Sequence, residues 1–229
     1  LSWKDPIKDL MVNQLGTYNI LKFCEKRGIG RIIFCSSMSA YGVPEILPTP
    51  ESIEMKPDTF YAVHKLASEH YLRIFAKEHG INYTIFRLYT TYGHGQNLDN
   101  INQGLLSIYL SYIVNQKPLI IKGSKDRTRD IIHVNDVIEA IILSLSNNIS
   151  YNKAYNLGSG ESLTIEKIIE LLITGMGYQF SSYPVEYEEN TQGDPFNTLA
   201  DISTVMEDLS WKPAISPHEG IRITLEAFQ

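Results

Sequence analysis

The sequence predicts an α/β fold in which helices cover a parallel sheet, followed by a smaller mixed α/β lobe. Helical and strand-like segments alternate through the first 96 residues, as they do when each strand is followed by a crossover helix. The pattern becomes less regular from about Asn97 onward, which indicates a second lobe laid over the sheet. We find no apolar stretch of about eighteen residues, the length that a membrane-spanning helix requires.

Composition is typical of a chain with a sizeable core, since 43% of the 229 residues are hydrophobic and 20% are charged. The formal net charge of -6 and the lack of a basic run argue against a nucleic-acid groove. Cys24 and Cys35 suit small apolar positions in a reducing compartment. We see no signal-peptide pattern and no Cys/His cluster, so we expect a cytoplasmic protein without a metal.

The first element is a predicted helix over residues 5–26. Asp5 suits the N-cap, Pro6 suits the first helical position, and Gly28 suits the stop. An apolar run then begins at Arg31 and ends in the hydroxyls of Ser36 and Ser37, which predicts a buried strand with its carboxyl end at a crevice.

A Pro-rich loop over residues 44–57 leads into a predicted helix over 61–79 and a strand over 82–88. Further along, the same patterns predict helices at 103–115, 135–145 and 164–174, and strands at 118–121, 154–157 and 184–187. Two short helices are expected to open at Asp201 and at Ser216. Gly158-Ser-Gly160 lacks the third glycine of a phosphate loop, so we interpret it as a turn.

Tyr61 and Lys65 are four residues apart, which places them on the same face of a helix. A nearby ammonium group favours the phenolate, so the pKa of Tyr61 is expected to fall below its ordinary value of about 10 and make Tyr61 a usable general base. This spacing also occurs by chance on many amphipathic helices. The upstream hydroxyl pair and the Pro57 that precedes the helix favour the catalytic interpretation.

Ser36-Ser37-x-x-x-Tyr41-Gly42 followed by Tyr61-x-x-x-Lys65 resembles the extended short-chain dehydrogenase/reductases, in the sugar-nucleotide epimerase/dehydratase branch that includes UDP-glucose 4-epimerase. The resemblance covers nearly the whole chain and implies a partial Rossmann-type sheet. Residues 1–96 would be the C-terminal part of the dinucleotide-binding domain, and residues 97–229 mainly the substrate lobe, with some segments returning to the sheet. A Gly-rich turn normally opens such a domain, and none precedes Asp5. We therefore expect the N-terminal Gly-rich half to be lacking and NAD to bind weakly to these residues alone.

The resemblance implies NAD as the cofactor and assigns roles to five residues. Tyr61 would exchange a proton with a sugar hydroxyl while hydride moves between the same carbon and the nicotinamide, and Ser37 would hydrogen-bond the reacting oxygen. Lys65 would lower the pKa of Tyr61 and hold the nicotinamide ribose. Asn13 and Ser36, together with Tyr61 and Lys65, would bind the cofactor.

The resemblance further implies contacts with a nucleotide sugar, expected to be UDP-linked, from Thr90, Asn102, Gln103, Arg129, Asp194 and Thr198. A guanidinium suits a diphosphate, although an ordinary ion pair would also explain Arg129. Asp194 would bond a ribose. Thr198 stands where related epimerases carry a bulky Tyr, so the freed volume would admit a 2-acetamido group unless Phe196 fills it.

The resemblance favours epimerisation at C4 of a UDP-hexose or UDP-N-acetylhexosamine. Related dehydratases need an acid and a base where this chain has Met38 and Ser39. A reductase or a decarboxylase could share the same catalytic residues. A non-catalytic nucleotide-binding protein remains the alternative if the chain is complete.

The predicted helices 5–26 and 61–79 resemble the pair that joins two subunits in this family. Each has more apolar positions than one sheet-facing stripe requires. We expect a homodimer, although the same apolar content would also suit helices that only cover the sheet.

Overall fold

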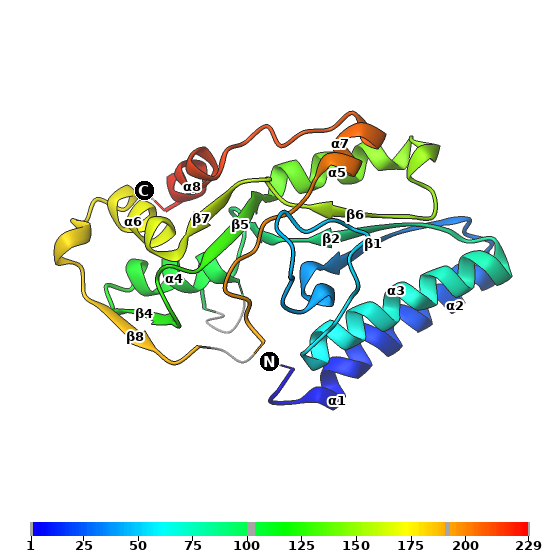
Figure 1. Ribbon diagram of the computed structural model, residues 1–229, viewed down its shortest axis with the longest axis horizontal. Helices are drawn as coiled ribbons and strands as arrows, with labels where there is room; N and C mark the ends of the chain where they lie inside the picture. The colour runs from blue at the N-terminus through cyan, green and yellow to red at the C-terminus, as the bar shows by residue number, and fades with distance from the viewer. Residues whose placement is uncertain (1, 100–103, 191–192, 229) are drawn as a thin grey trace.

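A computed structural model describes residues 2–99, 104–190 and 193–228 (Figure 1). It confirms the predicted α/β class. A three-stranded parallel sheet lies between two helical layers, and a second lobe with smaller sheets adjoins it. Among the described residues, no helix combines the length and apolar character needed to cross a membrane.

The first helical segment has three parts: α1 (Pro6–Asp9), the π-helical η1 (Leu10–Leu15) and α2 (Gly16–Arg27). The Asp5 carboxylate caps α1 by accepting a hydrogen bond from the Lys8 amide at 2.9 Å. Gly28 ends α2 with a φ of 65°, a conformation that glycine adopts without steric cost. The expected single α-helix is therefore interrupted by a wider turn, and such turns are frequent at functional sites.

The central sheet has the order β1 (Arg31–Ser37), β2 (Asn82–Leu88) and β6 (Lys153–Leu157), all parallel. Its register places Ser36 beside Arg87, and Arg87 beside Asn156. The carboxyl ends of the three strands therefore meet at one edge. After β1 the chain forms the 3₁₀ turn η2 (Met38–Tyr41) and then α3 (Phe60–His79).

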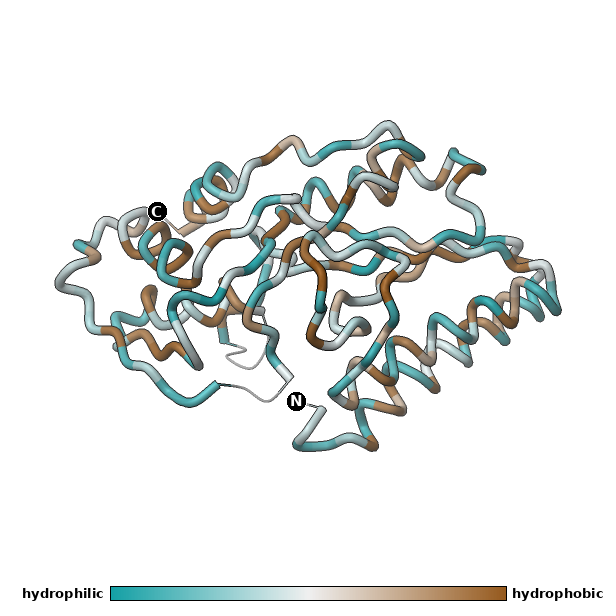
Figure 2. Tube along the Cα trace, in the orientation of Figure 1, coloured by the Kyte–Doolittle hydropathy of each residue, from teal (hydrophilic) through white to brown (hydrophobic). Residues whose placement is uncertain are grey.

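Each face of this sheet is covered by its own helical layer (Figure 1). On one face, α2 and α3 bury an apolar cluster against β1 and β2: Leu21, Cys24, Leu72, Phe75, Ile81, Tyr83 and Ile85. On the other face, α5 (Val134–Leu145) and α7 (Ser203–Leu209) pack with Phe86, Tyr155 and Trp211. Burying each such side chain contributes roughly 1.5–3 kcal/mol, so these clusters fix the helices on the sheet. Figure 2 shows hydrophobic and hydrophilic residues alternating along α2 and α3, as expected for helices with one buried face.

α5 begins at Val134, one residue before the helix predicted over 135–145. His133 is the N-cap, because its Nδ1 accepts a hydrogen bond from the Asn135 amide at 3.3 Å. Asp136 lies inside the first turn and accepts hydrogen bonds from the Ala214 and Ile215 amides at 3.0 and 3.2 Å. Its carboxylate therefore holds a distant loop.

The second lobe contains two small sheets. β3 (Thr90–Tyr92) pairs in parallel with β5 (Thr128–His133), which pairs antiparallel with β7 (Ser162–Thr164), and β4 (Leu119–Lys122) pairs in parallel with β8 (Val185–Glu188). Its remaining described elements are α4 (Leu105–Val114), α6 (Ile165–Gly175), α8 (Pro217–Glu226) and the 3₁₀ turn η4 (Phe180–Ser182). The 3₁₀ turn η3 (Asn148–Ser150) lies instead beside the central sheet, where the Ser150 carbonyl accepts a hydrogen bond from the Thr84 hydroxyl of β2 at 2.8 Å. A large apolar cluster joins α4, α6 and α8 to β4 and β5, so the lobe has a core of its own.

Candidate active site

The three predicted catalytic residues lie together where β1 ends and α3 begins. Ser37 Oγ accepts hydrogen bonds from the amide of Ser39 at 3.2 Å and from its hydroxyl at 2.9 Å. Ser37 also lies close enough to the phenol of Tyr61 to lower its pKa. Lys65 Nζ lies 5.8 Å from the centre of the Tyr61 ring and donates to the Cys35 carbonyl at 2.8 Å. The roles of the three residues stay predictions, but their arrangement allows proton transfer at Tyr61.

The pKa of Tyr61 differs from the expectation that Lys65 lowers it. Burial raises the pKa of Tyr61 above its ordinary value, and the negative charge of Asp9 acts in the same direction. The proximity of Ser37 lowers it. Lys65 directs its ammonium to a main-chain carbonyl. Ser37 therefore lowers the pKa of Tyr61, the effect that the sequence analysis expected from Lys65.

A second ionisable pair lies beside this cluster. His64 Nδ1 contacts the Asp9 carboxylate at 2.6 Å, and both side chains are nearly buried. Burial lowers the pKa of Lys65, while the charges of Asp9 and Glu69 oppose that shift. Asp9 therefore acts on both Tyr61 and Lys65 from the start of the π-helical segment.

The predicted cofactor residues occupy different surroundings. The Lys65 ammonium gives one hydrogen bond to Cys35 and can donate others, so with Tyr61 it fits the hydroxyls of the nicotinamide ribose of NAD. Asn13, in the π-helical turn, donates through its side chain to the Asp9 carbonyl at 3.2 Å. Ser36 is buried and donates to Glu69 Oε1 at 2.7 Å, so its hydroxyl is used within the protein. The cofactor roles of Asn13 and Ser36 stay predictions.

Two of the predicted substrate residues contact each other. Arg129 Nη2 donates to Asp194 Oδ1 at 2.7 Å, and Arg127 makes a second ion pair with the same carboxylate. Two buried guanidinium groups share one acid, so a positive charge remains for an anion such as a diphosphate. Sequence reasoning missed Arg127, although the alternation of Arg127 and Arg129 could have indicated it.

Thr90 and Thr198, the other predicted substrate residues that the structure describes, lie in the second lobe. Thr90 lies half-buried in β3. Thr198 is only 2% exposed, and its Oγ1 accepts a hydrogen bond from the Asp130 amide at 3.1 Å. Phe196, two residues earlier, is 54% exposed. Asn102 and Gln103 lie outside the described residues.

Gly158-Ser159-Gly160 forms a turn around a buried acid. Asp130 Oδ1 accepts from the Ser159 amide at 2.7 Å, and Oδ2 accepts from the Gly160 amide at 3.2 Å. A side chain at Gly158 would place its Cβ 2.5 Å from Asp130 Oδ2, which explains the glycine. The turn therefore uses its amides for a carboxylate of the protein.

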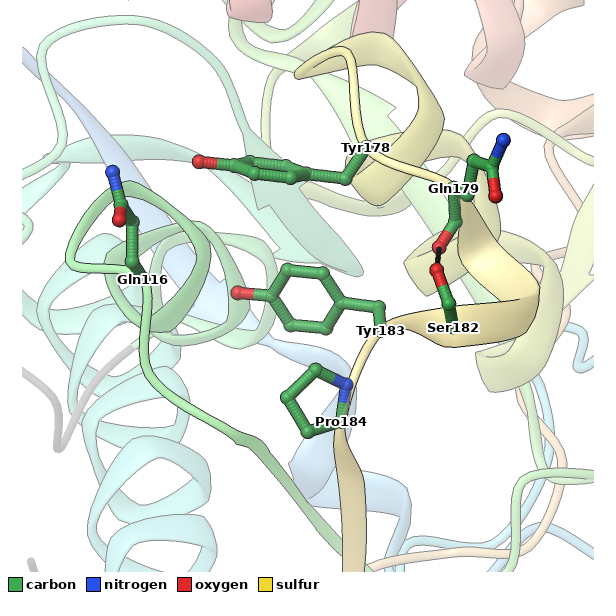
Figure 3. A pocket seen from close by; sticks show the side chains of 6 residues that line it. All are labelled: Gln116, Tyr178, Gln179, Ser182, Tyr183 and Pro184. Atoms are coloured by element: carbon green, nitrogen blue, oxygen red, sulfur yellow. Dashed lines mark hydrogen bonds between the residues drawn. The ribbon is translucent and has the colours of Figure 1, made fainter.

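A hollow of about 250 Å³ lies in the second lobe, near η4 (Figure 3). The rings of Tyr178 and Tyr183 meet edge to face there, with centres 5.5 Å apart. The Tyr183 hydroxyl donates to the Lys117 carbonyl at 3.0 Å, and the Ser182 hydroxyl donates to the Gln179 carbonyl at 3.3 Å. Because these groups serve the fold, we assign the hollow no role in catalysis.

Comparison with known proteins gives a consistent family assignment. The model of the NAD dependent epimerase/dehydratase family matches residues 1–158. A putative UDP-glucose 4-epimerase of Methanocaldococcus jannaschii is 31% identical over 96% of this chain and 70% of its own length. The dTDP-4-dehydro-6-deoxyglucose reductase of Escherichia coli is 32% identical over 96% of this chain and 68% of its own length.

Among solved structures, UDP-glucose 4-epimerase from Thermotoga maritima, with UDP-glucose, superimposes with a TM-score of 0.92 at 30% identity. The match covers 99% of this chain and 72% of that protein. The family resemblance inferred from the sequence, and NAD as the cofactor of the family, are confirmed. The chain belongs to the NAD-dependent epimerase/dehydratase family.

Proposed function

We propose that the protein catalyses NAD-dependent epimerisation at C4 of a UDP-linked hexose or N-acetylhexosamine. The observation that carries the proposal is the meeting of Ser37, Tyr61 and Lys65 at the carboxyl end of β1. In parallel α/β sheets this edge is where ligands bind. The resemblance to UDP-glucose 4-epimerases supports the choice of substrate.

Bound NAD would supply the hydride acceptor for oxidation and the hydride donor for the return step. Tyr61, as phenolate, takes the proton of the sugar 4-hydroxyl and gives it back when the keto sugar is reduced on its other face. Ser37 accepts two hydrogen bonds from Ser39, so its own proton is free for donation to Tyr61 or to the reacting oxygen. The ammonium of Lys65 orients the ribose.

The second lobe would hold the nucleotide diphosphate. Arg127 and Arg129 supply two guanidinium groups, and Asp194 neutralises one positive charge between them. A diphosphate carries more negative charge than one carboxylate, so it competes well for the same donors. Asp194 would then be released to bond a ribose hydroxyl.

A reductase is the second candidate, because the Escherichia coli reductase is as similar as the putative epimerase. The two reactions differ in what happens to the cofactor. An epimerase returns its hydride and consumes no NADH, whereas a reductase oxidises one NADH for each sugar. A dehydratase is disfavoured because Ser39 hydrogen-bonds to Ser37 and Met38 has no ionisable group.

The test is conversion of UDP-glucose and UDP-N-acetylglucosamine to their C4 epimers by the native protein, followed by nuclear magnetic resonance. We expect catalytic conversion without net NADH, and a loss of about a hundredfold or more in Tyr61→Phe. Tyr187→Phe changes an exposed tyrosine on β8 and is the matched control. Stoichiometric NADH consumption would establish the reductase instead.

We propose that position 198 sets which sugars are accepted. Thr198→Tyr is expected to raise the kcat/KM of UDP-glucose relative to that of UDP-N-acetylglucosamine, because a larger ring takes the volume of the acetamido group. The buried position means that stability must be measured in parallel. If Phe196→Ala changes this ratio and Thr198→Tyr does not, Phe196 is the gate.

A further inference from the structure

We infer that Glu69 and Arg87 are positioning residues: their buried ion pair holds the segment that carries Ser37 from both sides and so sets where the Ser37 hydroxyl meets Tyr61. The inference rests on the proposed roles of Ser37 and Tyr61. It concerns residues that do not themselves contact the reacting groups.

The ion pair is completely enclosed and joins two elements. Arg87, near the end of β2, donates through Nε to Glu69 Oε1 at 3.0 Å and through Nη2 to Oε2 at 2.8 Å. Glu69, on α3, is 0% exposed and Arg87 is 1% exposed. Taking both charges out of water is costly, and a protein is often equally stable when apolar residues of similar volume replace such a buried pair. The pair is therefore expected to contribute something other than stability.

The Glu69–Arg87 pair forms hydrogen bonds with residues that precede and follow Ser37 in the sequence. On one side, the Ser36 hydroxyl donates to Glu69 Oε1 at 2.7 Å. On the other side, Arg87 Nη1 donates to the Tyr41 hydroxyl at 2.8 Å, and that hydroxyl donates to Asn156 Oδ1 at 2.7 Å. Burial raises the pKa of Tyr41 to about 12, which keeps this hydroxyl protonated and able to donate. The short turn from Ser36 to Tyr41 is held at both ends.

The same pair fixes this turn relative to α3. Glu69 follows Lys65 by one helical turn and Tyr61 by two. The carboxylate that holds the end of β1 is thus on the helix that presents Tyr61 and Lys65. Loss of the hydrogen bonds would let the turn and the helix shift against each other, and a displacement of about 1 Å can cost a hundredfold in rate.

The consequence for Tyr61 has a definite sign. Ser37 lowers the pKa of Tyr61 through their proximity, so a displaced Ser37 leaves that pKa higher. Among the described residues, the ionisable groups near Tyr61 are Asp9 on α1, Cys35 on β1, and Lys65 and His64 on α3. All of them stay unchanged in the variants below.

The test uses the native protein with NAD and a nucleotide sugar. Ser36→Ala/Tyr41→Phe removes the hydrogen bond from Ser36 to Glu69 and both hydrogen bonds of the Tyr41 hydroxyl, and it keeps both charges. We expect kcat to fall about tenfold or more, with little change in the KM of the sugar. The acidic limb of the pH profile, over which kcat rises as Tyr61 loses its proton, should move to higher pH. Unchanged kcat and an unmoved limb would overturn the inference.

Two further variants separate positioning from folding. Arg73→Gln removes a 3.2 Å contact with the same Glu69 carboxylate on the partly exposed side, so it should leave kcat unchanged. Glu69→Leu/Arg87→Met removes both charges and keeps apolar volume, so it is expected to fold. It should nevertheless show the lowered kcat and the displaced limb. A folded double variant with normal kcat would refute the role.

Failure of the proposed epimerase function can be distinguished from failure of the positioning role. If the unmodified protein converts no nucleotide sugar, that function is wrong, and the inference is then decided by crystallography. A Ser36→Ala/Tyr41→Phe structure in which Ser37 has moved relative to Tyr61 supports the positioning role. One in which Ser37 Oγ keeps its place overturns it, whatever the activity.

Discussion

At the scale of single residues, the hydroxyl of Ser37 has the clearest electrostatic effect on Tyr61. Burial raises the pKa of Tyr61 and the nearby Ser37 hydroxyl lowers it. A general base must lose its proton before it acts, so activity rises as pH passes through this pKa. We predict that Ser37→Ala lowers kcat by about a hundredfold and moves the acidic limb of kcat to higher pH.

The measurement is kcat from about pH 6 to pH 10 in Ser37→Ala and in the unmodified protein, within the range over which a tyrosine base titrates. Ser39→Ala is a useful comparison, because it removes one donor to Ser37 and leaves the Ser37 hydroxyl in place. Its effect should be smaller. A limb that stays in place, or moves to lower pH, would show that Ser37 does not act on the pKa of Tyr61.

At the scale of elements, Glu69 ties α3 to β1 and β2. Burial by itself would raise the pKa of Glu69, but the hydrogen bonds and the charge of Arg87 outweigh burial and lower it. A lowered pKa in the folded state adds stability above the unfolded pKa of about 4.3 and loses it as pH falls through the folded pKa. We predict that Glu69→Gln loses less stability on acidification than the unmodified protein does.

Urea unfolding between about pH 7 and pH 3 gives the slope of the free energy of unfolding against pH, because that range spans the carboxylate titration. At neutral pH the variant should also be less stable by roughly 3–5 kcal/mol, since Arg87 is left buried without its partner. Glu78→Gln, exposed near the end of the same helix, is the matched control. Parallel slopes for Glu69→Gln and the unmodified protein would contradict the prediction.

At the scale of the whole molecule, α1 to α3 present an apolar face outside the core. The large exposed side chains on these helices and on η1 are Ile7, Leu10, Met11, Val12, Leu15, Tyr18, Ile20, Phe23, Phe60, Val63 and Ile74. A large patch of exposed apolar side chains usually marks an interaction site. We propose that two copies pair through these helices, as the sequence resemblance implies, and predict a dimer for the native protein.

Light scattering of the native protein tests this prediction. Val12→Lys/Ile20→Lys places two charges on the face and should give a monomer, because an unpaired charge is costly to bury. Ile142→Lys changes an equally exposed side chain on α5, on the other side of the sheet, and should leave the dimer intact. A dimer that survives both charges would place the interface elsewhere.

The sequence by itself determined most of the elements and the local part of the candidate site. Apolar periodicity and turn residues identified the α/β class, and the helix limits near Asp5, Gly28 and Gly80 follow from capping chemistry that acts within a few residues. The spacing of Tyr61 and Lys65 placed them on one face of α3. These features depend on neighbouring residues, so a short window of sequence contains them.

Only the tertiary structure decided which distant groups meet. The Glu69–Arg87 pair depends on how α3 packs over the sheet, and the alignment of Ser36, Arg87 and Asn156 depends on the register of three strands. The pairing of Asp194 with Arg127 and Arg129, like the burial of Thr198, depends on a segment returning to β5. Burial also reversed the expected pKa shift of Tyr61. Ion pairing and desolvation act between residues that are close in space, and their partners are set by packing rather than by spacing along the chain.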